Sequence, residues 1–202
     1  MLFEKFEMES SMGSSISVAA LFYNPNIHPL DEFNKRKEGA VFVAERYCVP
    51  MFVYNDCEQD RWLKMGEASG NNASESEAYG DTPQPGRHQA KPVPAQRENQ
   101  PAGQGRRAVK GPCNMCYSTR LGFVAKKARD EGYGAFTTTL LISPYQGHEL
   151  IKTIGGKCAQ ENGVEFYYED FRQRFREGQG LAKGMGVYRQ KYCGCIISNY
   201  YD

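Results

Sequence analysis

Several features that define large protein classes are absent from this sequence of 202 residues. No apolar run approaches the roughly 18 to 20 residues that a membrane span requires. The acidic first residues also lack the basic start and continuous apolar stretch of a secretory signal. The formal net charge is only +1, whereas obligate nucleic-acid binders are strongly basic. The sequence therefore predicts a cytoplasmic protein without a membrane partner, for which a nucleic-acid partner is permitted but not required.

Common catalytic signatures are missing as well. The sequence has no glycine-rich loop that would cradle a phosphate, no dinucleotide fingerprint and no Ser-His-Asp arrangement. These absences argue against a kinase, a nicotinamide-dependent dehydrogenase or a serine hydrolase.

Cysteine is the residue type with an informative pattern. The seven cysteines are an odd number, which no closed disulfide framework would use up. Four of them form two close pairs, Cys113-x-x-Cys116 and Cys193-Gly-Cys195. In a reducing compartment, paired cysteines favour metal binding or catalysis over structural disulfides. The spacing alone leaves both of these roles open.

Two classes of protein fit these pairs by their spacing alone. In the first, all four thiols form one closed tetrahedral zinc site in a module that binds RNA or protein without turnover. In the second, a metal-free thiol redox protein uses only the Cys-Gly-Cys pair. The remaining cysteines, Cys48, Cys57 and Cys158, are predicted to be packing residues.

The composition divides the chain into three segments. Residues 67–111 are rich in Ser, Gly, Pro, Gln and Arg and nearly devoid of large apolar side chains, which predicts a disordered insertion. Residues 1–66 and 112–202 are then two parts of one α/β domain, since a flexible insertion costs little once its ends are held.

Outside this insertion, short β-rich apolar runs alternate with segments of helical periodicity. The alternation predicts a Rossmann-like, three-layer domain with a parallel sheet. The amphipathic first residues need a sheet to lie on, so we expect the fold to lack its first strand in the chain as given. The expected strands cover residues 15–23, 51–54, 134–142 and 164–168, and the expected helices cover 30–48, 113–132 and 148–162.

Ligands of such a domain gather at the carboxyl ends of the parallel strands. The loops expected there contain His28, Asp56, His148 and Asp170, which are candidate proton donors or metal neighbours.

Five blocks of sequence, in this order, carry a resemblance to a known family. They are Tyr23-Asn-Pro-Asn-Ile-His28-Pro29, Cys113-x-x-Cys116-Tyr117-x-x-Arg120-Leu121, Phe136-Thr-Thr-Thr139-Leu-x-x-Ser143-Pro144-Tyr145-x-x-His148-Glu149, Tyr168-Glu-Asp170-Phe171-Arg172-x-x-Phe175-Arg176 and Tyr188-Arg-Gln-Lys-Tyr-Cys193-Gly-Cys195. Together they resemble the iron–sulfur epoxyqueuosine reductases named QueH.

This resemblance implies a tRNA-modifying oxidoreductase with a HUP-type Rossmann-like fold. Its reaction reduces the epoxide of epoxyqueuosine at the wobble position to queuosine, the last step of queuosine biosynthesis, with electrons from an unidentified donor. It further implies that Cys113 and Cys116 ligate a [4Fe–4S] cluster, with an additional iron as a further expectation. Cys193 and Cys195 would form the redox-active disulfide.

The sequence departs from the family pattern at one point. The family completes its cluster with two adjacent cysteines on the loop after a first strand, and this sequence contains no adjacent cysteines. We therefore expect the chain as given to be truncated and inactive, and a version extended upstream through such a pair to be active.

Overall fold

The computed structural model describes residues 17–56, 60, 62–64 and 111–196. The insertion predicted over 67–111 lies outside the described residues except for its last position, and Cys57 lies outside them too. Within these ranges, no helix is both long and apolar enough to cross a membrane.

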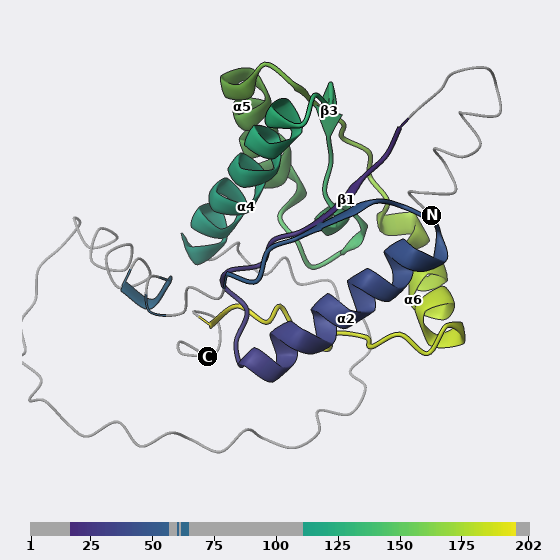
Figure 1. The fold of residues 1–202 in the computed structure, drawn as a ribbon. Coiled ribbons are helices and arrows are strands. Elements are labelled where there is room, and N and C mark those ends of the chain that lie inside the picture. The colour runs from purple at the N-terminus through teal and green to yellow at the C-terminus, as the bar shows by residue number, and fades with distance from the viewer. Residues whose placement is uncertain (1–16, 57–59, 61, 65–110, 197–202) are drawn as a thin grey trace, which may run out of the picture.

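The first half of the described chain is a β-α-β unit (Figure 1). β1 (Ala20–Phe22) and β2 (Met51–Val53) pair in parallel, and α2 (Leu30–Arg46) is the crossover that parallel strands require. On the inner face of α2, Phe33 is 1% exposed and packs edge-on against Phe22, with ring centroids 5.3 Å apart. Burial of this aromatic pair fixes α2 against the strands.

The second half repeats the alternation. α4 (Gly111–Asp130) and α5 (His148–Asn162) pack against each other, and β3 (Ala135–Phe136) pairs in parallel with β4 (Glu165–Phe166). The largest hydrophobic cluster lies around these two helices. Its fully buried members include Trp62, Leu121, Ala125, Leu141, Ile151 and Ile196.

Short helices complete the described chain. η1 (Thr139–Ile142) follows β3, and η2 (Arg172–Arg174) leads into α6 (Phe175–Gly184). After α6 the chain returns to the loop that follows β1, where Ile27 and Cys195 form an antiparallel bridge. This return brings the second cysteine pair back to the first half of the domain.

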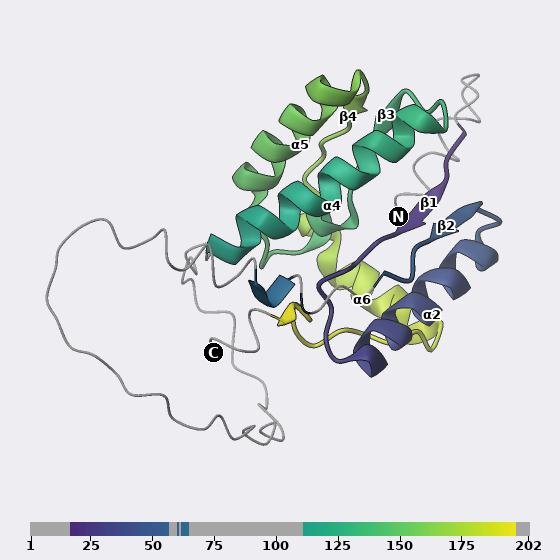
Figure 2. The same cartoon turned by 60° about the vertical axis from the view of Figure 1, so that its left-hand side comes forward.

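The predicted mixed α/β chain with parallel strands is confirmed. The helix predicted over 148–162 has these bounds in α5, because Gly163 ends it in the left-handed region with a φ of 67°. The helices predicted over 30–48 and 113–132 correspond to α2 and α4. Figures 1 and 2 place α4 and α5 on one side of the strands and α2 and α6 on the other, which is compatible with a three-layer fold.

The strand predicted over 134–142 is wrong beyond Phe136. The side chain of Thr138 accepts a hydrogen bond from the backbone N–H of Leu140, so it caps η1 where the apolar run suggested extended chain. Thr137 ends the extended part instead, because its hydroxyl donates to the carbonyl of Tyr167 at 2.8 Å. The loop at this strand end therefore begins earlier than predicted.

Two of the three cysteines predicted to pack can be compared with the structure. Cys158 is buried on α5, which confirms the prediction. Cys48 is exposed, so the prediction is wrong for this residue. It follows the last turn of α2 with a φ of 53°, in the left-handed region, and the chain turns there before its side chain can reach the core.

Two neighbouring glycines of α5 provide a matched test of this packing. Gly155→Ala is expected to lower the free energy of unfolding by about 1–3 kcal/mol, because the added Cβ would overlap the ring of Phe166 on β4. Gly156→Ala has open space around the added Cβ and should raise stability by about 0.5–1 kcal/mol through helix propensity. Urea unfolding measures both, and equal effects would contradict this packing of β4 on α5.

Candidate thiol site

Three segments that are distant in the sequence meet at the candidate site. Asn26, on the loop after β1, is 2% exposed and donates from Nδ2 to Sγ of Cys116 on α4 at 3.4 Å. Its backbone carbonyl accepts from the N–H of Ile196 at 2.9 Å, and its neighbour Ile27 bridges to Cys195. Asn26 therefore lies between the two cysteine pairs. We call Asn26 and the four paired cysteines the thiol site.

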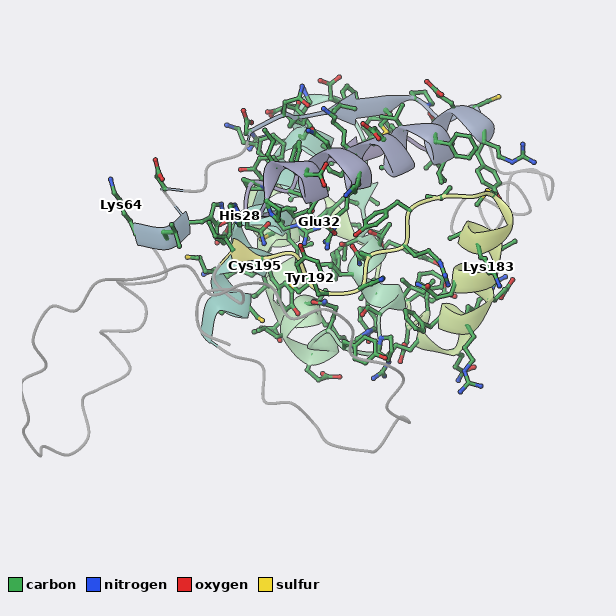
Figure 3. The ribbon with its side chains drawn as sticks, turned by 90° about the horizontal axis from the view of Figure 1, so that it is seen from below. His28, Glu32, Lys64, Lys183, Tyr192 and Cys195 are labelled. Carbon is green, nitrogen blue, oxygen red and sulfur yellow. The ribbon has the colours of Figure 1, made fainter. Side chains whose placement is uncertain are left out.

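Backbone contacts extend along this loop. The N–H of His28 donates to the carbonyl of Gly194 at 2.9 Å, and the hydroxyl of Tyr192 donates to the carbonyl of His28 at 3.3 Å. Figure 3 shows His28, Tyr192 and Cys195 close together beside α2. The Cys-Gly-Cys segment is thus held on the loop by hydrogen bonds of its backbone.

Each cysteine pair presents one buried and one accessible thiol. Cys116 and Cys195 are 6% and 5% exposed, whereas Cys113 is half-buried and Cys193 is exposed. None of the four forms a disulfide with another described residue. The accessible members lie where a reagent or substrate can reach them, and the buried members lie near each other.

Burial raises the pKa of the Cys116 thiol to about 11, and the attraction of Arg120 opposes this rise. Interactions with Cys195 and Cys193 add to it. The two pairs are thus close enough to influence each other electrostatically. At neutral pH and without a metal, Cys116 is a neutral thiol.

Tyr117 connects α4 to the loop before α5. Its hydroxyl donates to Oε1 of Gln146 at 2.6 Å and accepts from the N–H of Gly147 at 3.2 Å. Burial raises the pKa of Tyr117 to about 12, so the hydroxyl keeps the proton that it donates. This contact fixes the position of the helix turn that carries Cys116.

Tyr117→Phe is expected to lower the free energy of unfolding by about 1–3 kcal/mol, because it leaves a backbone N–H and an amide oxygen without their partner. Tyr145→Phe is the matched control, since the Tyr145 side chain is 83% exposed. Chemical denaturation measures the difference. Equal stability of the two variants would mean that the Tyr117 hydroxyl contributes nothing to the fold.

The candidate donors His148 and Asp170 lie side by side, with Nδ1 of His148 at 4.0 Å from Oδ1 of Asp170. Hydrogen bonds from Arg172 lower the pKa of Asp170 to about 2. Asp170 is therefore ionised at neutral pH and cannot donate a proton. The buried ring of His148 contacts the hydroxyl of Tyr168 and the carbonyl of Ser143 through its two nitrogens.

The candidate His28 lies at the thiol site itself. Its Nδ1 and the Oδ1 of Asn26 are buried side-chain atoms that find no hydrogen-bond partner in the part of the chain that the structure describes. Buried polar atoms are almost always satisfied, so two orphans on one short loop indicate where a bound group would sit. Asp56, the remaining candidate, is exposed beyond the end of β2.

Sequence reasoning missed three residues that hold the Cys-Gly-Cys segment. Arg36 on α2 donates to the carbonyls of Tyr192 and Cys193, and Glu32 accepts from both Arg36 and Tyr188. The Glu-Arg spacing of four along α2 was readable as a helix pair. The sequence did not indicate that Arg36 contacts Tyr192 and Cys193, which lie 156 and 157 positions away.

Within ranges 17–56, 60, 62–64 and 111–196, no three His, Cys, Asp or Glu side chains converge closely enough to hold a metal ion. The four thiols therefore do not form a tetrahedral zinc site within the described residues.

The fold and the site together define a mixed α/β protein with parallel strands, in which Cys116 and the Cys-Gly-Cys segment meet at the loop after β1. A family described as "Epoxyqueuosine reductase QueH" matches residues 5–78 and 96–200. The chain belongs to this QueH family, as its sequence blocks predicted.

Individual relatives agree with the family match. A Thermotoga maritima protein named epoxyqueuosine reductase QueH is 32% identical over 179 residues, which are 88% of this chain and 77% of the relative. Proteins of the same name are 29% identical in Dehalococcoides mccartyi and 28% identical in Acinetobacter baylyi, each over 195 residues. These alignments cover 96% and 95% of this chain, and 85% and 73% of the respective relatives.

Proposed function

We propose that the protein is an oxidoreductase that reduces epoxyqueuosine at the tRNA wobble position to queuosine, in the last step of queuosine biosynthesis. Membership of the QueH family supports the reaction. The observation that supports this reaction for this chain is that the loop after β1 contacts both cysteine pairs, because Asn26 binds Cys116 while its neighbour Ile27 pairs with Cys195.

The thiol chemistry balances the reaction. Removing the epoxide oxygen breaks two C–O bonds, forms the C=C bond and releases water, which consumes two electrons and two protons. Oxidation of Cys193 and Cys195 from two thiols to one disulfide releases the same two electrons and two protons. A separate electron donor must then reduce this disulfide again before the next turnover.

A [4Fe–4S] cluster takes four cysteine thiolates in most proteins, and the thiol site fits half of that set. Cys113 and Cys116 lie three positions apart in the first turns of α4, a spacing that suits two ligands of one cluster. Binding would deprotonate Cys116, whose pKa is raised to about 11 by burial without a metal. We propose that these two residues hold the cluster. When bound, such a cluster supplies Lewis acidity and electrons close to the substrate oxygen.

Residues of this chain provide the polar groups around the two cysteine pairs. The orphaned Nδ1 of His28 and Oδ1 of Asn26 lie beside the pairs and are available to a polar substrate group. Two histidines remain as candidates for protonating the leaving oxygen, His28 at the thiol site and the buried His148 beside Asp170. The Rossmann-like, three-layer arrangement is part of this proposal, because it explains why the loops after the strands carry these groups.

The test is reduction of epoxyqueuosine in tRNA, followed by digestion and mass spectrometry of the nucleosides. Two preparations are reconstituted with iron and sulfide: the chain itself, and the chain preceded by the segment of a family member that carries adjacent cysteines. Queuosine is expected from any preparation that contains stoichiometric iron and sulfide. A loaded preparation that leaves epoxyqueuosine unchanged would show that the proposed reaction is wrong.

A further inference from the structure

A buried ion pair on α2 contacts the Cys-Gly-Cys segment. The Arg36 and Glu32 side chains are 10% and 7% exposed, and Nε of Arg36 donates to Oε1 of Glu32 at 2.7 Å. The other carboxylate oxygen of Glu32 accepts from the hydroxyl of Tyr188 at 2.6 Å. Figure 3 shows Glu32 next to Tyr192 and Cys195, while Lys64 and Lys183 lie at the periphery. Glu32 and Tyr188 leave the guanidinium little freedom to move.

The guanidinium then binds both peptide groups that flank Cys193. Nη1 of Arg36 donates to the carbonyl of Cys193 at 2.8 Å, and Nη2 donates to the carbonyl of Tyr192 at 2.9 Å. The guanidinium also lies over the Tyr192 ring, with its carbon 5.5 Å from the ring centroid. A planar fork with fixed donors holds two carbonyls in one geometry, which a lysine ammonium cannot do equally well.

Gly194 permits this close approach. Its φ is +82°, in the left-handed region, and a Cβ at this position would lie 2.6 Å from the Arg36 guanidinium. The turn between the two cysteines is therefore packed directly against the cation. In this geometry Cys193 is exposed and Cys195 is buried, and no disulfide joins them.

We propose that Arg36 is a positioning residue that biases the Cys193–Cys195 pair toward the dithiol form, with Glu32 and Tyr188 holding it in place. Closing a disulfide across one residue makes a very small ring that includes the Cys193 carbonyl carbon. Ring closure that rotates this peptide group would weaken its bond to Arg36. The inference rests on the proposed function in one respect, that this pair exchanges electrons during the reaction.

The bias is measured as the equilibrium between dithiol and disulfide in glutathione buffers. Glutathione disulfide takes two electrons and two protons from the pair, so two S–H bonds break, one S–S bond forms and two glutathione thiols are released. The disulfide fraction is read by alkylation and mass spectrometry of the peptide that contains Cys193 and Cys195.

Arg36→Met is expected to shift this equilibrium about tenfold toward the disulfide, or about 30 mV toward more negative potential, because charge-assisted bonds to the dithiol geometry are lost. Arg36→Lys keeps the charge and should recover part of the shift. Lys35→Met is the matched control, since Lys35 directly precedes Arg36 on α2 and is exposed in a pair with Asp31.

The relative alkylation rates of the two thiols are a second readout that does not require a disulfide. In the wild-type protein Cys193 should react much faster than Cys195, and in Arg36→Met the two rates should converge. Thermal unfolding of each variant checks that the fold is intact.

Three outcomes separate this inference from the proposed function. A folded Arg36→Met variant with wild-type potential and wild-type alkylation ratio overturns the role of Arg36. A shift of the same size in Lys35→Met also overturns it, because the effect would then be one of general charge. A pair that forms no disulfide in any variant overturns the redox role of Cys193 and Cys195, and with it the dithiol bias.

Discussion

Replacing Cys113 and Cys116 together with alanine should abolish iron and sulfide binding after anaerobic reconstitution. A [4Fe–4S] cluster is held by cysteine thiolates, so the double variant loses two neighbouring ligands on α4. Iron, acid-labile sulfide and zinc are measured per chain. Cys48→Ala is the matched control, since Cys48 is exposed and follows α2, away from the thiol site.

The metal found in this experiment discriminates between classes of protein. Stoichiometric iron and sulfide that disappear in the double variant support the proposed cluster. Bound zinc without sulfide would contradict it and favour a structural zinc module. Iron and sulfide that persist in the double variant would mean that other residues hold the cluster.

The second large effect concerns the other cysteine pair. In protein that is loaded with iron and sulfide, Cys193→Ser and Cys195→Ser should each reduce queuosine formation to background while metal content stays unchanged. A hydroxyl cannot form a disulfide, so neither variant can release the two electrons that the reaction consumes. Nucleoside mass spectrometry and metal analysis of the same samples check both parts of this prediction.

The outcome that contradicts this assignment is equally clear. Undiminished queuosine formation in either serine variant would remove the pair from the reaction. Loss of metal in Cys195→Ser would make Cys195 a cluster ligand instead, which its position near Cys116 makes worth testing. Cys158→Ala changes a thiol buried on α5 and controls for general effects of cysteine removal.

Local sequence patterns predicted those helices and strands whose ends are determined by residues nearby in the sequence. The bounds of α5 followed from helical periodicity, and in the structure Gly163 lies directly after its last turn. The strand predicted after Gly134 was too long because β-branched threonines also cap helices, and Thr138 does so here. Hydrophobic pattern alone cannot distinguish these two uses of threonine.

For the candidate site, the sequence predicted which residue types are present but not which of them come into contact. Cysteine spacing identified the four thiols, but the contact of Asn26 with Cys116 spans 90 positions and that of Glu32 with Tyr188 spans 156. Such contacts depend on how the elements pack, and no local pattern encodes them. For the same reason, the exposed position of Cys48 was not foreseen, since it depends on where the chain turns after α2.

The antiparallel bridge between Ile27 and Cys195 also has a consequence for biosynthesis. A ribosome synthesises Asn26 early and Cys195 only after nearly all of the described chain has emerged. The helix that carries Cys113 and Cys116 can fold before that, but its partner thiols do not yet exist. Domains acquire long-range contacts last. The centre is therefore assembled after translation has passed residue 196, and any cofactor inserted earlier would meet an unfinished set of neighbours.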